Sequence, residues 1–219
     1  MIIISDIDRV ANELKNRFTK VIPNSNYDWK NPSLNILDCV LSLNRKYEEV
    51  VKPRVERFRI NNPSCFNIED LLKLIKKYSE GEFINAELNY NHTEREIIIK
   101  EVCEYLLLEI ANDESGDQLT RCKNWAENAR PGDAYFLGIK GFGLAGFQYL
   151  RMLFGAQTTK PDVHIKAFIS NVIGKEVTAV QSLYILEKAA YKINYPLRDL
   201  DFEIWKYQKL NKTKLKPTS

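Results

Sequence analysis

The chain has 219 residues, a formal net charge of +3 and 28% charged residues, values typical of a globular protein. It is long enough to bury a substantial core, in one large domain or two small ones. The mildly basic balance permits nucleic-acid binding but does not indicate it. No window reaches the roughly eighteen apolar residues of a membrane span. The start MIIISDIDR has no basic segment before its apolar run, so we expect a cytoplasmic protein without a secretory signal.

Cysteine and histidine spacing excludes the usual metal sites. Zinc and iron–sulfur centres show closely spaced ligands, often as C-x-x-C pairs. This chain has no such pair, and its two histidines lie far apart. We therefore expect no metal, no iron–sulfur cluster and no other cofactor. The cysteines are interpreted as four buried, reduced thiols: Cys39, Cys65, Cys103 and Cys122.

Nearly every long periodic segment has the helical repeat. Between Ile7 and Phe18, for example, apolar residues recur three and four positions apart. Strand signals are almost absent, so the predicted fold class is all-α, with about ten helices. The predicted helices cover about 7–18, 34–51, 71–75, 93–110, 119–129, a segment after Pro161, 177–191 and a short segment from Leu200.

Two local features lie in the middle of the chain. Residues 79–92 are less regular and are predicted to form a loop that carries exposed aromatic side chains. Thr93, followed three residues later by Glu96, resembles a capping box at the start of the long helix.

The segment from Leu137 to Ile165 contains the main candidate motif. Gly141 and Gly143 flank Phe142 between two apolar stretches, and this spacing allows a sharp turn without a Cβ clash. Such a turn leaves backbone amides free near Gly141, Gly143 and Ala145, where the helix dipole favours a phosphate. A tight turn between two helices, without any ligand, is the structural alternative.

The run I139-K-G-F-G-L-A-G-F resembles the hairpin of the helix–hairpin–helix DNA glycosylase superfamily, which includes endonuclease III and 3-methyladenine glycosylase II. The family hairpin usually reads L-P-G-[VI]-G-x-x-T-A, and a catalytic aspartate follows about eighteen residues later in a V-D-x-H-[VI] setting. Here Pro161-Asp162-Val163-His164-Ile165 fits that setting, seventeen residues after Ala145.

The resemblance extends to both sides of the hairpin and covers about residues 30–206. Leu41-Ser42-Leu43-Asn44, inside the predicted helix, is similar to the family's L-S-x-Q segment, whose amide side chain fills the gap left by an extruded base. Residues 201–205 (DFEIW) are similar to a D-x-x-[IL]-W close. The resemblance implies a two-lobed helical fold. We expect a central lobe of residues 38–155 and a second lobe of residues 1–37 plus 156–219.

Three residues depart from the family pattern. Ala145 replaces the lysine that forms a Schiff base in bifunctional members, so lysine-dependent strand cleavage is not expected here. Lys140 replaces the family's proline, and Gly146 replaces its threonine.

The resemblance implies that Asp162 stabilises positive charge on the sugar as the glycosidic bond breaks. The hairpin at Lys140, Gly141, Gly143 and Ala145 would hold the DNA backbone. Asp162 as a simple helix cap is the alternative. His164 is expected to pack or hydrogen-bond rather than catalyse.

Other residues are assigned to the hairpin surface, to the base pocket or core, and to wedges. Arg151 or Lys166 would add charge to the hairpin. Trp125 and Tyr135 are either pocket residues or core residues. Wedges into the DNA would come from residues 79–92, with Phe83, Leu88 and Tyr90 as candidates.

The sequence therefore predicts a monomeric, monofunctional DNA glycosylase acting on double-stranded DNA with a damaged or mismatched base. A catalytically inert DNA-binding protein that keeps the hairpin is the second hypothesis. A purely structural helical protein is the third.

Overall fold

The computed structural model of the chain describes residues 4–21 and 29–214, with side chains as far as residue 210. Within these ranges every regular element is a helix and no strand occurs, which confirms the predicted all-α class. No helix in the described part is both long and apolar enough to cross a membrane. The chain divides into two compact units. Unit 1 comprises Met1–Ser25 and Gln157–Ser219, and unit 2 comprises Asn26–Ala156.

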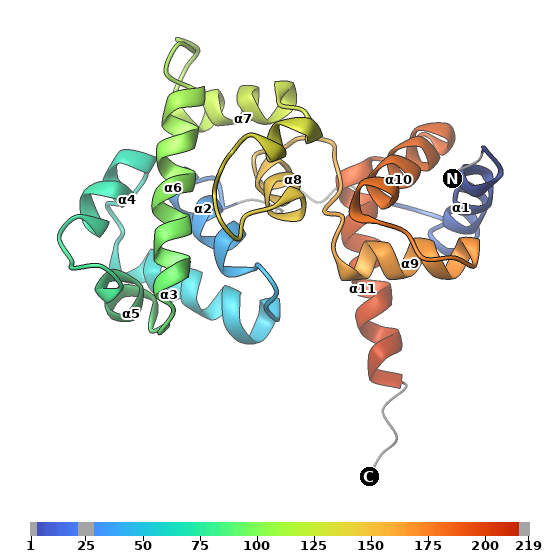
Figure 1. Ribbon diagram of the computed structural model, residues 1–219, viewed down its shortest axis with the longest axis horizontal. Helices are drawn as coiled ribbons and strands as arrows, with labels where there is room; N and C mark the ends of the chain where they lie inside the picture. Colours follow the sequence, from blue (N-terminus) through green and yellow to red (C-terminus); the bar gives the residue numbers. More distant parts are fainter. Residues whose placement is uncertain (1–3, 22–28, 215–219) are drawn as a thin grey trace. The chain divides into compact units, whose positions relative to one another are not determined.

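Unit 2 is built around α2 (Pro32–Leu41), whose ten residues are all buried. The sequence PSLNILDCVL is apolar on most sides, as expected for a helix surrounded by others. Figure 1 shows α2 behind the long helix α6. The helices that contact α2 are α3 (Lys52–Asn61), α4 (Ile68–Ile75), α6 (Thr93–Glu109), α7 (Gln118–Asn128) and α8 (Leu144–Leu153).

A buried carboxylate lies inside this arrangement. Asp38 on α2 is 1% exposed and accepts hydrogen bonds from three aromatic side chains. The donors are Trp29 Nε1 at 2.7 Å, Tyr47 Oη at 2.8 Å and Tyr149 Oη at 2.9 Å. Because a buried carboxylate is costly without such donors, this network joins α2 to α8 and to the π-helical turn at Tyr47–Val51.

Unit 1 consists of four helices from the two ends of the chain. Helix α1 packs on α9 and α10, and α11 packs on the same two helices. Apolar side chains on their facing sides form a core that shares no residue with the core of unit 2. The helices are α1 (Ile4–Arg17), α9 (Val163–Ile173), α10 (Ala179–Ile193) and α11 (Leu197–Lys214).

The predicted helix 34–51 is wrong as a continuous element. Helix α2 ends at Leu41, and Asn44 has a left-handed backbone with φ of 56°. The break is stabilised by a distant contact, since the Arg95 guanidinium donates to the Leu43 carbonyl at 2.6 Å. Local helix propensity is overridden there by a tertiary hydrogen bond.

The predicted loop at 79–92 is also wrong. It contains the helix α5 (Glu82–Leu88), in which Phe83 and Leu88 are fully buried. Glu96 accepts from the amides of Gly81 and Ile84 at the start of α5 and does not complete a capping box with Thr93. Phe83 and Leu88 therefore cannot act as exposed wedges.

The expected lobe boundary at residue 38 falls inside α2. This helix belongs wholly to unit 2, whose range begins at Asn26. The physical reason is the burial of α2 on all sides, which makes it the centre of a core rather than a linker. The second boundary, between Ala156 and Gln157, lies one residue after the expected one.

Candidate functional site

The hairpin is a tight turn that leads directly into α8. The Phe142 amide donates to the Ile139 carbonyl at 3.1 Å, and Gly141 has φ of +83°. This left-handed conformation favours glycine. Gly143 is the N-cap residue of α8, and no side chain caps the helix. Lys140, Gly141 and Gly143 are all exposed.

An uncapped, exposed helix start can bind an anion. The first amides of a helix have no partner within the helix, and the dipole places partial positive charge there. The turn therefore offers the amides from Gly143 onward, with the Lys140 ammonium nearby in sequence, to an anion. Ala145 is half-buried in the first turn of α8 and has no amine to offer.

The residues between α7 and the hairpin do not form a continuous α-helix. Helix α7 ends at Asn128 and is followed by a single 3₁₀ helix, Pro131–Tyr135. Tyr135 is 67% exposed and Phe136 is 89% exposed. The sequence alternative that placed Tyr135 in a core is therefore wrong.

Packing around the hairpin leaves no space for a side chain at Gly146. A Cβ on Gly146 would lie 2.9 Å from the Phe142 ring and 3.0 Å from the Leu43 side chain. The Phe142 ring therefore occupies the volume that a larger residue at position 146 would need.

Asn44 lies beside the hairpin in unit 2. Its side chain is exposed after the end of α2, and the neighbouring Leu43 packs against Gly146. Two residues of α6 connect the same region. Arg95 binds the Leu43 carbonyl, and Ile98, one turn further along, lies 3.3 Å from a Cβ built on Gly141. Four predicted residues, Asn44, Lys140, Gly141 and Gly143, thus lie in neighbouring segments of one unit.

Asp162 belongs to unit 1 and is the N-cap residue of α9, which is the geometry expected from the structural alternative, a helix cap. Its Oδ1 accepts from the amides of His164 at 2.8 Å and Ile165 at 3.3 Å. Its Oδ2 accepts no hydrogen bond from the described residues, and the residue is half-buried. The backbone therefore fixes one carboxylate oxygen, and capping does not use the other.

Asp201, on α11, holds the segment that precedes Asp162. Its carboxylate accepts from the Thr159 hydroxyl and from the Lys160 amide at 2.9 Å. The Asp162 amide in turn donates to the Lys160 carbonyl at 2.7 Å. The pKa of Asp201 is raised to about 7, chiefly by burial and also by the nearby Asp162, while the bond from Thr159 opposes the shift. The sequence pattern marked Asp201 only as part of a terminal motif.

Two predicted contributors belong to the interior instead. Arg151 is 7% exposed and donates to the Ala126 carbonyl and to Gln148, so it cannot add charge to the hairpin surface. Trp125 is 7% exposed and packs edge-on against Phe147. It is therefore a core residue of unit 2.

The four cysteines are buried, as predicted. Burial raises the pKa of the Cys122 thiol to about 12, which disfavours the reactive thiolate. Among the described residues, no three His, Cys, Asp or Glu side chains gather as a metal site.

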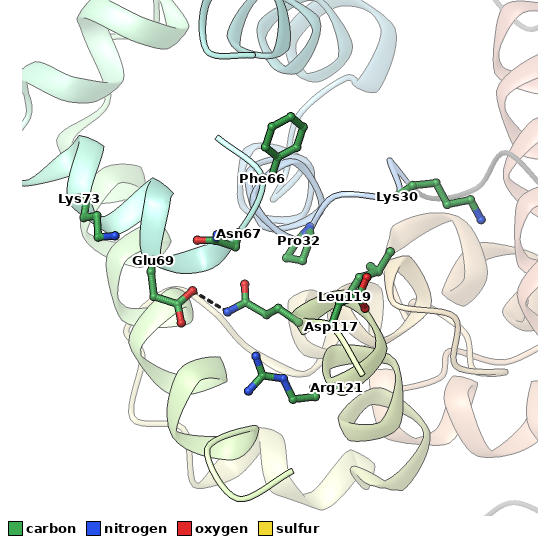
Figure 2. Close-up of a pocket in the computed structure, with 10 residues that line it drawn as sticks. Lys30, Pro32, Phe66, Asn67, Glu69, Lys73, Asp117, Leu119 and Arg121 are labelled. Atoms are coloured by element: carbon green, nitrogen blue, oxygen red, sulfur yellow. Dashed lines mark hydrogen bonds between the residues drawn. The ribbon is translucent and has the colours of Figure 1, made fainter. Parts of the chain in front are cut away.

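A separate groove of about 650 Å³ lies at the other end of α2, where Pro32 begins the helix. Figure 2 shows that its lining mixes basic and acidic side chains, including Lys73, Arg121 and Glu69. Three helix starts meet there, but each carries its own side-chain cap: Asn31 on α2, Asn67 on α4 and Asp117 on α7. Unlike the start of α8, each of these helix starts has one first-turn amide bonded to its own cap side chain.

Comparison with known proteins matches the chain to a protein family. The model of a family described as a domain of unknown function, DUF8548, matches residues 6–209. The chain belongs to this family. The match spans both units and includes the hairpin, Asn44, Asp162 and Asp201. No curated protein and no solved structure matches the chain.

Proposed function

We propose that this protein is a monofunctional DNA glycosylase that hydrolyses the N-glycosidic bond of a damaged or mismatched base. The single observation that carries the proposal is the arrangement of Asp162. Its Oδ1 is held by two backbone amides, and its Oδ2 accepts no hydrogen bond from the described residues. An oriented carboxylate of this kind stabilises the positive charge that develops on the sugar in such a reaction.

Backbone binding is the second part of the proposal. The uncapped start of α8 after the Gly141 turn supports contact with a phosphate. Asn44, exposed in a left-handed turn beside the hairpin, would occupy the space left by an extruded base. Extrusion costs a few kcal/mol, and both contacts would offset that cost.

The proposed reaction leaves an intact strand with an abasic site. Ala145 has no amine for a Schiff base, so the hairpin position offers no route to strand cleavage. We expect strand breaks only after alkali treatment of the product.

The test is single-turnover base release from a panel of duplexes that each carry one lesion or mismatch. We expect wild-type protein to process at least one duplex and Asp162→Asn to lose at least about 100-fold in rate. Because asparagine is as good an N-cap as aspartate, this change removes the charge and keeps the cap.

Asp117→Asn is the matched control, since Asp117 caps α7 in the same way. It should release base at the wild-type rate. Equal rates for wild type and Asp162→Asn would contradict the proposed role of Asp162. Duplex binding without any base release would instead support an inert DNA-binding protein.

A further inference from the structure

Three arginines surround one tyrosine beside Asn44. Arg45 donates from Nε to the Tyr90 hydroxyl at 2.7 Å, and the Arg54 guanidinium lies 4.9 Å from the centre of the Tyr90 ring. Arg95 donates to the Leu43 carbonyl and interacts electrostatically with Tyr90. We call these four residues the Tyr90 cluster.

The charge of the Tyr90 cluster is balanced only weakly by Glu94, which acts on Arg95 without forming an ion pair. None of the three arginines forms an ion pair within the described ranges. Other basic residues nearby in sequence are paired, such as Lys46 with Glu49 and Lys52 with Glu48. Three guanidinium groups around one ring repel one another, and this repulsion favours the binding of an anion.

The positive charge of Arg95 is costly because this side chain is buried. It is 8% exposed, and its Nε has no hydrogen-bond partner although that atom is inaccessible to solvent. Burial lowers the pKa of Arg95, with Arg45 adding to the effect and Tyr90 and Glu94 opposing it. Buried charges in proteins are normally paired, whereas Arg95 forms no ion pair with a carboxylate among the described residues.

The side chain that can reach a ligand is Arg45. It is exposed and uses two of its five N–H groups, on the Tyr90 hydroxyl and on the Asn44 carbonyl. The remaining guanidinium edge has the fork geometry that suits phosphate oxygens. Arg54 is less available, since it donates to the Val50 and Asn89 carbonyls.

The cluster lies close to the hairpin along α6. Arg95 donates to the Leu43 carbonyl, and the Ile98 side chain lies 3.3 Å from a Cβ built on Gly141. Arg95 and Ile98 are three residues apart and are therefore neighbours on the surface of α6. A ligand that bridges the cluster and the hairpin must carry more than one negative charge, and each strand of DNA supplies one about every 3.4 Å along the axis.

We infer that the Tyr90 cluster is a second phosphate site, which binds a DNA phosphodiester through Arg45 while the hairpin binds another. This inference rests on the proposed DNA-binding function and adds a contact independent of Asp162. It also implies that Asn44 is flanked by two contacts to DNA phosphates, one at Arg45 and one at the hairpin.

The test is binding of an undamaged duplex measured by fluorescence anisotropy over a series of KCl concentrations. Each phosphate contact contributes close to one unit to the slope of log K against log salt. We expect Arg45→Gln to reduce the slope by about one and to weaken binding several-fold at low salt.

Two control variants separate charge from structure. Tyr90→Phe removes the hydroxyl that holds Arg45 but keeps all charges, so the wild-type slope should persist. Arg59→Gln removes an exposed arginine that is already paired with Glu56 and should also leave the slope unchanged. A wild-type slope for Arg45→Gln, or an equal loss for Arg59→Gln, would overturn the inference.

The base-release assay, run on the same wild-type protein, keeps the two proposals distinguishable. Base release with an unchanged Arg45→Gln slope would overturn the second phosphate site and leave the glycosylase standing. A reduced slope without base release from any duplex would support the site and count against the glycosylase.

Discussion

At the scale of single residues, the hairpin depends on the pairing of Phe142 with Gly146. The Phe142 ring occupies the space that a side chain at Gly146 would need. The coupling of these two residues becomes visible only when the distances are known.

Gly146→Ala should destabilise unit 2 by about 1–3 kcal/mol, because the new Cβ would meet the Phe142 ring and Leu43. Phe142→Val should destabilise less in the Gly146→Ala protein than in wild type, because the smaller side chain also relieves the clash with the new Cβ. Urea unfolding measures both effects. Gly132→Ala is the matched control, as a Cβ at that position would have no neighbouring atom within 4 Å. Additive effects of the two hairpin changes would contradict the coupling.

At the scale of elements, the segment from Thr159 to Asp162 is held by α11 through Asp201. The folded state raises the pKa of Asp201 from 3.8 to about 7. Between these values the folded protein binds the proton more tightly than the unfolded chain does. The contribution to stability is therefore full below about pH 4 and is lost as the pH rises through about 7.

Asp201→Asn should remove this pH dependence. The rise of the pKa from 3.8 to about 7 corresponds to at most about 4 kcal/mol, since each tenfold change in proton affinity is worth about 1.36 kcal/mol. Wild-type protein should therefore lose stability as the pH rises from about 4 to about 7, while the variant loses less. Thermal unfolding at several pH values measures the difference. Parallel curves for the two proteins would show that Asp201 titrates normally.

Part of the candidate site could not be predicted from the sequence, and the segment after Leu41 shows the reason. The residues after Leu41 include good helix formers, so the pattern predicts a continuous helix through Asn44. The break depends on Arg95, which is 52 positions further along the chain from the Leu43 carbonyl that it binds. By contrast, the turn at Gly141 and the cap at Asp162 follow from neighbouring residues. Local signals were therefore predictable, whereas the Tyr90 cluster, assembled from three segments, was not.

At the scale of the whole molecule, the two units have separate apolar cores. Unit 2 is one continuous stretch of chain and contains the hairpin, Asn44 and the Tyr90 cluster. Unit 1 joins both ends of the chain and contains Asp162 and Asp201. The proposed backbone contacts thus belong to one unit, and the proposed catalytic carboxylate belongs to the other.

A fragment of residues 26–156 should fold by itself, because its core contains no residue of unit 1. We expect a helical circular dichroism spectrum, cooperative unfolding and salt-dependent binding to duplex DNA, but no base release. A fragment that remains unfolded would show that unit 2 needs the rest of the chain for its stability.

The most direct test of the central claim is detection of the free base itself. Duplexes with different lesions are pooled and incubated with excess wild-type protein, Asp162→Asn or Asp117→Asn, and released bases are identified by mass spectrometry. The account predicts one or more free bases with wild type and Asp117→Asn, none with Asp162→Asn, and intact strands before alkali. Equal release by Asp162→Asn, or strand cleavage without alkali, would contradict it.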